Sequence, residues 1–514
     1  MTSENLRHPT IRADRQSAIR NPQSAILLVC LLAFTLQLGP LYDNRFHPDE
    51  SLFSTWSLQI ARGENLLLTG VPIDKPPLLI YLNALSFYVF GQSELAARVP
   101  NLIASVVSVA LVWRLVIGRS VTGQPVHPLP VDRVTNLRSN QFTNLLPPLL
   151  FALSPFAISF APTAFLDPMM IMFGLASLVA ASRGRTGWAG VLLGLSFATK
   201  VQGLFFTPLL WVFASPCHHV TVSPRHAVAH SLRVMLGFGI IAALVLVWDR
   251  ARGGLPFWQQ QTINYGDIRL IYADEVGPRL IGWLAFLPYF FGPIVGAIGL
   301  IGLPQVLRTS HRDRWLLLWL VALLALHWLF NFPIWDRYVL LLVPIAAMVV
   351  GQSIGRLVNW VLARSIILSS RHLVRPIMFA LVLATALPFS SAAAESQIPI
   401  GGDHGANDGI DRVAVFFKSL PSGTVVYDHW LAWELDYYVG EGFVFLAYFD
   451  TPAALQDDLR VFGGAKRYVI FPGHESPDRV ADAIGEVGYT LQAVFTTQNR
   501  FGQISFAIFE IVPQ

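Results

Sequence analysis

The run VMLGFGIIAALVLVW, from Val234 to Trp248, contains no charged residue and is flanked by Arg233 and Asp249. Because about 20 consecutive apolar residues in a helix cross the hydrocarbon core of a bilayer, this segment predicts a membrane span. Comparable apolar runs occur from Ile26 to Leu38 and from Ile377 to Leu387. We therefore expect one large helical membrane domain rather than a series of soluble units.

Composition and charge support this interpretation and divide the chain in two. Of 514 residues, 54% are hydrophobic and only 13% are charged, whereas soluble domains contain about 25% charged residues. Residues 1–392 hold 29 Lys and Arg against 16 Asp and Glu, while residues 393–514 hold 7 against 16. The basic residues are scattered over short loops and form no patch, so nucleic acid is not an expected partner.

These patterns predict three regions. Residues 1–24 form a polar cytoplasmic tail, and residues 25–392 form the transmembrane domain. In residues 393–514 short β-like runs alternate with helix-like stretches, which predicts a small α/β domain outside the cytoplasm. The β-like runs are Thr424–Tyr427, Arg467–Phe471 and Gln503–Ile511.

The apolar segments predict about eleven spans, if the stretch 187–214 is counted as two short helices broken near Lys200. The run from Pro76 to Phe90 is too short for a full span and predicts an interfacial or re-entrant segment. With this count, arginines collect in the loops on one side and acids in the loops on the other, which places the N-terminus in the cytoplasm. The two longest outside loops are then residues 41–76 and 249–279.

The loop 41–76 contains the first candidate site residues. Asp49 and Glu50 precede an amphipathic stretch, and Asp74 and Lys75 precede Pro76-Pro77. A carboxylate at the membrane surface can take a proton from an acceptor hydroxyl, and two carboxylates can hold a divalent cation against a phosphate. Lys75 could meet a lipid phosphate. Equally, Asp49 could only cap the helix that starts there, and Lys75 could only extend to the interface.

Three further sites carry charge in unusual places. Lys200 lies within an apolar stretch, where a charge is costly, so it either contacts substrate or pairs with an acid such as Asp167. The loop 249–279 combines aromatic and amide side chains with Arg269, which suits sugar and phosphate recognition but also an ordinary solvated loop. Arg337, at the entrance of a late span, is a second phosphate contact or an interfacial anchor.

The sequence also excludes several classes of protein. It has no Walker motif, no Gly-x-Ser-x-Gly turn and no Gly-x-Gly-x-x-Gly at a strand end, so no nucleotide cofactor is expected. Its two cysteines cannot form a disulfide framework. A transporter or lipid flippase, and a non-catalytic assembly subunit, stay open as alternatives. The first is less favoured because polar residues gather in the outside loops rather than at mid-membrane.

Five motifs taken together resemble those of the GT-C membrane glycosyltransferases, in the group that joins bacterial aminoarabinose transferases and protein O-mannosyltransferases. They are Asp49-Glu50, Asp74-Lys75-Pro76-Pro77-Leu78, Arg98-x-Pro-Asn101, Leu166-Asp167-Pro168 and Thr199-Lys200-x-x-Gly203. The resemblance covers most of residues 24–391. It implies a polytopic α-helical GT-C fold in the bacterial inner membrane. It also implies an inverting transfer of a hexosyl or pentosyl group from a polyprenyl-phosphate donor to an extracytoplasmic acceptor, which can be lipid, protein or polysaccharide.

The resemblance also suggests roles for individual residues. Asp49, beside Glu50, matches the general base, Asp74 matches an acid of a divalent-metal site, and Lys75 matches a contact to the lipid phosphate. The remaining substrate-binding candidates are Arg98, Asp167, Lys200, Arg269 and Arg337, of which Arg269 or Arg337 would assist Lys75 at the leaving phosphate.

Two features depart from the family pattern. Aminoarabinose transferases pair the metal-site acid with a histidine in the large later loop, and Gln259 to Asn264 contain no histidine. The chain also lacks the large lumenal insertion of the protein mannosyltransferases. The resemblance therefore implies neither the acceptor of the aminoarabinose transferases nor that of the protein mannosyltransferases.

Overall fold

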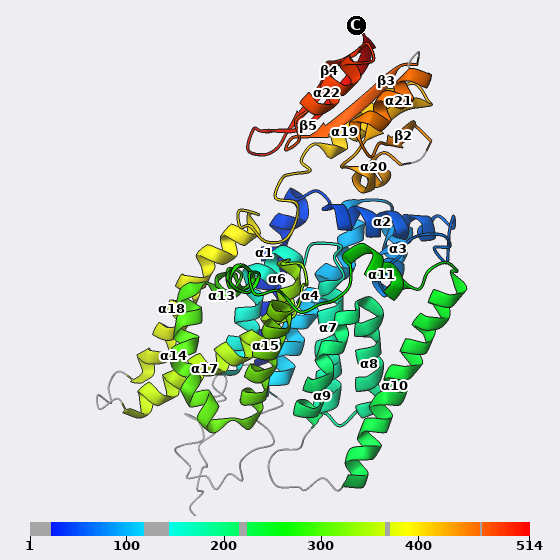
Figure 1. Ribbon diagram of the computed structural model, residues 1–514. Helices are drawn as coiled ribbons and strands as arrows, with labels where there is room; N and C mark the ends of the chain where they lie inside the picture. Colours follow the sequence, from blue (N-terminus) through cyan, green and yellow to red (C-terminus); the bar gives the residue numbers. More distant parts are fainter. Residues whose placement is uncertain (1–21, 118–142, 215–223, 365–370, 441, 463–464) are drawn as a thin grey trace, which may run out of the picture.

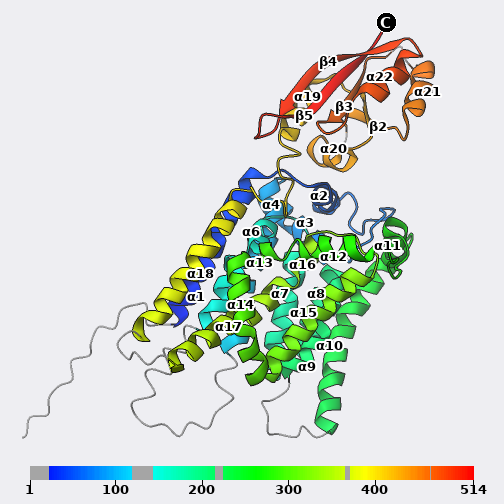
Figure 2. The same cartoon turned by 60° about the vertical axis from the view of Figure 1, so that its left-hand side comes forward.

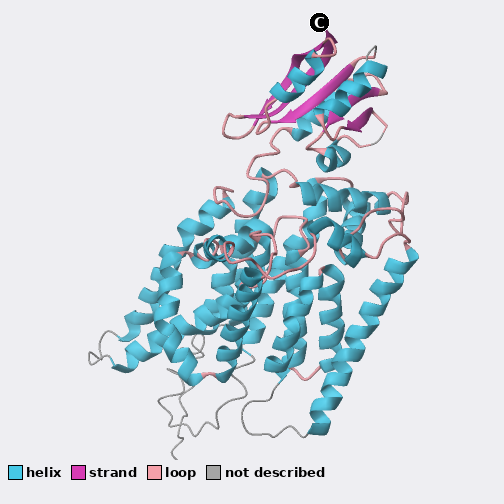
Figure 3. Cartoon of the chain, in the orientation of Figure 1, coloured by secondary structure: helices cyan, strands magenta, loops and turns pink. Residues whose placement is uncertain are grey.

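A computed structural model describes residues 22–117, 143–214, 224–364, 371–440, 442–462 and 465–514. The predicted cytoplasmic tail, residues 1–24, lies almost entirely outside these ranges. The described chain consists of a helical body and a smaller domain that contains all five named strands (Figures 1 and 3). This confirms the predicted fold class, an α-helical polytopic membrane protein with a small C-terminal α/β domain.

The helical body is built from elements that follow one another with short connections. Its helices are α1 (Pro22–Asp43), α2 (Pro48–Ala61), α3 (Leu78–Phe90), α4 (Glu94–Ile117), a helix at Thr143–Ala152, α6 (Pro155–Phe160), α7 (Asp167–Ser182), α8 (Thr186–Thr199), a 3-10 helix (Val201–Phe206), α9 (Thr207–Ala214), α10 (Pro224–Ala251), α11 (Phe257–Tyr265), α12 (Val276–Leu284), α13 (Pro288–Phe291), α14 (Pro293–Thr309), α15 (His311–Leu329), α16 (Arg337–Leu340), α17 (Val343–Arg364) and α18 (Arg371–Ala394).

Five of the described helices are long and apolar enough to cross a membrane on their own: α1, α4, α10, α17 and α18. A sixth span is formed if the segments Val276–Phe291 and Pro293–Thr309, which meet at 94°, are counted as one broken span. Other apolar helices, including α7 and α8, have fewer than 18 residues. The predicted total of about eleven spans therefore stays a prediction.

The predicted break near Lys200 is confirmed. Helix α8 ends at Thr199, and Lys200 has an extended backbone (φ −155°, ψ 137°) before the 3-10 helix begins. Gly203 permits this sharp turn, because a Cβ atom there would lie 2.5 Å from the carbonyl carbon of Ser196 in α8. The glycine of the Thr199-Lys200-x-x-Gly203 motif thus lets the chain fold back against its own preceding helix.

The segment predicted to be interfacial forms α3, which has only 13 residues. Helices α2 and α3 pack together at the end of the helical body that carries the C-terminal domain (Figures 1 and 2). Tyr88 and Phe90 of α3 are exposed, as expected for a short helix whose apolar side chains contact lipid at the interface.

The C-terminal domain is a three-layer α/β structure. Its elements are α19 (Ile410–Ser419), β1 (Thr424–Asp428), α20 (Ala432–Tyr438), β2 (Val444–Tyr448), α21 (Pro452–Phe462), β3 (Arg467–Pro472), α22 (Asp478–Gly485), β4 (Tyr489–Gln498) and β5 (Ile504–Pro513). The strand order is β2-β1-β3-β5-β4, with β1 parallel to β2 and β3, and β5 antiparallel to β3 and β4. In register, Val426 lies opposite Leu446 and Tyr468.

Two apolar clusters cover the faces of this sheet. Helices α19 and α20 contribute to one cluster, and α21 and α22 contribute to the other. Helix α20 also packs against α2 of the helical body. The sheet domain therefore lies above α2 (Figure 2), and Asp49 belongs to the first turn of this helix.

Candidate active site

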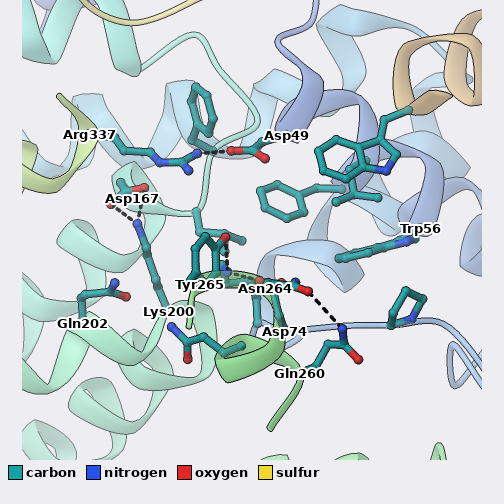
Figure 4. Close-up of a pocket in the computed structure, with 18 of the residues that line it drawn as sticks. Asp49, Trp56, Asp74, Asp167, Lys200, Gln202, Gln260, Asn264, Tyr265 and Arg337 are labelled. Atoms are coloured by element: carbon teal, nitrogen blue, oxygen red, sulfur yellow. Dashed lines mark hydrogen bonds and ion pairs between the residues drawn. The ribbon is translucent and has the colours of Figure 1, made fainter. Parts of the chain in front are cut away.

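Three ion pairs between an aspartate and a basic residue lie on one cavity. They are Asp49–Arg337, Asp74–Lys75 and Asp167–Lys200, and all six residues line the cavity (Figure 4). These residues come from the start of α2, the loop before α3, the start of α7, the break after α8 and the start of α16. The fold thus brings together six of the nine residues that the sequence predicts for the site, from five separate places in the chain.

Asp49 is available for chemistry because other residues cap its helix. His47 is the N-cap, its Nδ1 accepts a hydrogen bond from the Asp49 backbone N–H, and Glu50 accepts one from the His47 backbone N–H at 3.1 Å. The alternative in which Asp49 only caps the helix is therefore wrong. The Asp49 carboxylate instead contacts the Arg337 guanidinium. Burial raises the pKa of Asp49, but the positive charge of Arg337 and the hydrogen bond from its guanidinium outweigh this effect and hold the pKa below its ordinary value.

Lys75 is held at the cavity by two partners. Its ammonium contacts Asp74 and donates a hydrogen bond to the Tyr265 hydroxyl at 3.0 Å, and it lies 4.5 Å from the centre of the Tyr265 ring. Burial lowers the pKa of Lys75, an effect that the Asp74 charge only partly offsets. Since nearly all of this side chain is covered, Lys75 is not an interfacial residue that extends into water.

Lys200 and Asp167 form the deepest of the three pairs. The Lys200 ammonium donates to both carboxylate oxygens of Asp167, at 2.7 and 2.9 Å, and both side chains are buried. The predicted pair with Asp167 is therefore confirmed, and Lys200 also lines the cavity, but its contact with substrate stays a prediction.

Glu50 and Arg98 do not line the cavity, and their predicted catalytic and substrate-binding roles do not fit their positions. Both side chains are fully buried, and their charged groups pair at 3.2 Å. Arg98 also donates to backbone carbonyls of the loop before α2, at Leu41, Asn44 and Arg45. Glu50 accepts from the Ala164 backbone N–H at 2.7 Å. The pair therefore fixes the loop that carries Asp49.

Asn101 completes this support on the other side. Its amide donates to the carbonyls of Thr163 and Phe165, at 2.7 and 2.6 Å, in the loop that leads to Asp167. The Arg98-x-Pro-Asn101 motif thus positions two of the cavity's acids, Asp49 and Asp167, from one turn of α4. In the sequence, the spacing of Arg98 and Asn101 fits either role, so it could not distinguish positioning of the acids from contact with substrate.

Arg269 also lies outside the cavity. Its guanidinium binds both carboxylate oxygens of Glu275, at 2.8 and 2.9 Å, and covers the Tyr272 ring at 4.1 Å. Its predicted role as a phosphate contact does not fit this position. The same loop instead contributes Tyr265, Gln260 and Asn264 to the cavity wall.

The metal site implied by the family resemblance does not fit the residues at Asp74. Its carboxylate is occupied by the Lys75 ammonium, and Tyr265 also hydrogen bonds to it. Across the described ranges, no group of three or more His, Cys, Asp and Glu side chains is arranged to hold a metal ion. A cation next to Lys75 would be repelled by the ammonium, so we assign no step to a metal.

A second cavity of about 680 Å³ adjoins the first and shares Asp49, Arg337 and Tyr265 with it. It is lined in addition by His47, His404, Trp335, Asp336 and Trp433, among others. Trp433 belongs to α20 of the sheet domain and borders both cavities. The sequence did not predict that Trp433 reaches the site, because no local sequence pattern shows which side chain of a distant domain will lie there.

Fold and site together define a polytopic membrane protein with a charged cavity beneath a small α/β domain, and this architecture matches known structures. The crystal structure of ArnT from Cupriavidus metallidurans bound to undecaprenyl phosphate has a TM-score of 0.59 with this chain, at 13% identity, over 96% of this chain and 98% of that one. Its apo state gives the same TM-score and coverage at 14% identity. The chain therefore has the ArnT fold.

Two sequence comparisons point the same way over shorter stretches. The family model described as dolichyl-phosphate-mannose-protein mannosyltransferase matches residues 74–125, which begin at Asp74 and include Arg98 and Asn101. The Bacillus subtilis (strain 168) protein named "Putative mannosyltransferase YycA" is 26% identical over 186 residues, which are 35% of this chain and 24% of that protein. The match thus spans about a quarter of that relative's length. The resemblance inferred from the motifs is confirmed.

Proposed function

We propose that this protein is a glycosyltransferase that moves a sugar from a polyprenyl-phosphate donor to an acceptor on the side of the membrane that carries the sheet domain. One observation supports this above all: a buried carboxylate, Asp49, shares a cavity with Lys75, Lys200 and Arg337. This combination supplies a proton acceptor and cations for a phosphate in one place. The ArnT structure with undecaprenyl phosphate shows that a protein of this fold binds such a lipid.

In the proposed reaction the acceptor hydroxyl attacks the anomeric carbon of the donor sugar. Asp49 takes the hydroxyl proton as the new glycosidic C–O bond forms. The bond between the anomeric carbon and the phosphate oxygen breaks, and its electron pair leaves with the polyprenyl phosphate. Attack opposite to the leaving phosphate inverts the anomeric configuration.

The charges of the cavity suit these steps. The low pKa of Asp49 keeps its carboxylate ionised and ready to accept the proton. Lys75 and Arg337 are held by Asp74 and Asp49 before donor binds, so a phosphate can take over these ion pairs without rearrangement of the backbone. We place the cavity on the extracytoplasmic side of the bacterial inner membrane, with the N-terminus in the cytoplasm, because of the arginine distribution in the loops.

The test is donor turnover by the purified protein in liposomes, with a panel of polyprenyl-phosphate sugars and detection of released polyprenyl phosphate. We expect release from one donor, and loss of release in Asp49→Asn with lipid binding retained. The matched control is Asp267→Asn, whose side chain is exposed on the loop after α11. Tight lipid binding without release from any donor, across a panel of acceptors, would refute the proposal and favour a lipid flippase.

A further inference from the structure

The second cavity has the size and chemistry of a subsite for the acceptor. Its volume of about 680 Å³ falls within the range of ligand pockets, about 300 to 1,000 Å³. It opens from the position of Asp49, the group that would receive the acceptor's proton. Of the three cations proposed to bind phosphate, Lys75 and Lys200 line the first cavity and not the second, whereas Arg337 and Asp49 line both.

The charged groups of this second cavity disfavour an anionic ligand. Arg337 is the only lysine or arginine among its described lining residues, and in the proposed reaction the donor phosphate takes it over from Asp49, so it is not available to an acceptor. Asp336 adds a second carboxylate, which accepts from the backbone N–H groups of Arg337 and Gly401 at 2.8 and 2.7 Å. Burial lowers the pKa of both His47 and His404, so these rings are neutral near pH 7. A phosphate or carboxylate would therefore meet acids without a free cation.

Aromatic side chains supply the remaining recognition surface. Trp335 is fixed between Arg337, 4.3 Å from its ring centre, and Tyr265, at a centroid distance of 5.8 Å. Trp433 has 45% of its surface exposed, although it borders both cavities. Aromatic faces stack on the C–H faces of sugar rings, and a large partly exposed tryptophan at a pocket wall is a common specificity determinant.

The sheet domain holds Trp433 firmly over the cavity. In α20, Tyr437 packs on Phe46 at a centroid distance of 4.7 Å, and the Tyr438 hydroxyl accepts from the Phe46 backbone N–H at 3.0 Å. Tyr438 also donates to Glu94 at the start of α4. Helix α20, which carries Trp433, is thus anchored to the helical body by contacts with Phe46 and with Glu94.

We propose that the second cavity binds an uncharged carbohydrate acceptor and that Trp433 of the sheet domain determines this specificity by stacking on the acceptor's sugar ring. The inference rests on the proposed glycosyl transfer and narrows its acceptor class. It assigns the C-terminal domain a direct part in recognition, because the domain contributes one wall of the subsite. A phosphate-bearing glycolipid is excluded as the preferred acceptor.

The first experiment measures acceptor binding without catalysis. Full-length wild-type protein in nanodiscs with bound polyprenyl phosphate, which carries no sugar to transfer, is probed by saturation-transfer NMR with a matched pair, methyl glucoside and glucose 6-phosphate, which share a ring and differ in charge. We expect binding of the neutral sugar only, and its loss in Trp433→Ala. Preferential binding of the phosphorylated sugar, or unchanged binding without Trp433, would overturn the inference.

The second experiment uses transfer and separates this inference from the proposed function. With wild-type activity established on any acceptor, Trp433→Ala is expected to raise KM for a neutral acceptor about tenfold with kcat unchanged. KM for the donor should rise less, because Trp433 also borders the first cavity. Trp433→Phe should restore most of the loss. The control is Phe445→Ala, an aromatic residue with 64% exposure on β2. A larger rise in donor KM than in acceptor KM, or a preference for phosphorylated acceptors, would refute the acceptor assignment while the glycosyltransferase assignment stands.

Discussion

At the residue scale, two adjacent acids have opposite roles. Asp49 faces the cavity, whereas Glu50 is buried against Arg98 and never reaches it. Sequence motifs identify the Asp49-Glu50 pair but cannot say which member faces inward. The helical turn decides this, because the capping box with His47 rotates Glu50 back toward the loop.

This division of roles predicts the effect of Glu50→Gln. The substitution leaves the buried Arg98 charge with Glu94, 3.7 Å away, as its only carboxylate partner among the described residues, and we expect this to cost about 1 to 3 kcal/mol of folding free energy. Thermal unfolding in detergent should show a clear fall in Tm, whereas Asp49→Asn should change Tm little. Glu64→Gln, at an exposed ion pair with Arg62, is the control. Loss of turnover in Glu50→Gln with an unchanged Tm would mean that Glu50 takes part in the chemistry.

Other residue assignments depended on contacts that the sequence does not contain. The sequence predicted the six ion-paired residues of the cavity individually, and Lys200 with Asp167 even as a pair. It could not place Arg98 or Arg269, because an arginine that binds backbone carbonyls or a nearby carboxylate has the same sequence pattern as one that binds phosphate. It also could not assign Trp433 to the cavity, because that position depends on how a distant domain docks.

At the element scale, the break after α8 makes the cavity possible. A continuous helix would keep Lys200 in regular α-helical geometry, whereas the extended backbone there turns its side chain toward Asp167. The apolar stretch with one central lysine was enough to predict this break. Gly203 permits the break because it packs closely against Ser196. This contact exists only in the folded turn, so the sequence did not reveal it.

A Gly203→Ala substitution tests this element directly. The added Cβ would lie within 2.7 Å of backbone atoms of Ser196, so the 3-10 helix must shift and move Lys200. We expect a fall in polyprenyl-phosphate affinity of about tenfold or more, measured by equilibrium binding of the labelled lipid. The control is Gly239→Ala in α10, where a Cβ meets nothing within 4 Å. Equal affinity in the two variants would show that the turn does not position Lys200.

At the scale of the whole molecule, helix α20, which packs against α2, carries a buried carboxyl group, Glu434. Burial raises the pKa of Glu434 in α20 to about 7, and the nearby acids Asp428 and Asp49 add to this shift. The folded protein therefore prefers the neutral carboxyl group. Because this pKa is raised above its unfolded value of about 4.3, the stability contributed by Glu434 is present at low pH and is lost as pH rises toward 7.

The corresponding measurement compares wild type with Glu434→Gln. The amide cannot ionise, so the variant should gain stability relative to wild type as pH rises from 5 to 8. Differential scanning fluorimetry at several pH values gives this difference in Tm, and the exposed carboxylate of Asp457 serves as a control through Asp457→Asn. A Tm difference that does not change with pH would place the ionisation of Glu434 outside this range.

The attachment of the sheet domain also has a consequence for the order in which the protein is made. The loop before α2 is synthesised early, yet Asn407 donates to its Phe46 carbonyl at 2.7 Å and Arg500 to its Asp43 carbonyl at 2.5 Å. Both partners leave the ribosome more than 350 residues later. A nascent chain therefore inserts its acids and cations into the membrane long before the upper wall of the cavity exists, and the site matures only after the sheet domain has been translated.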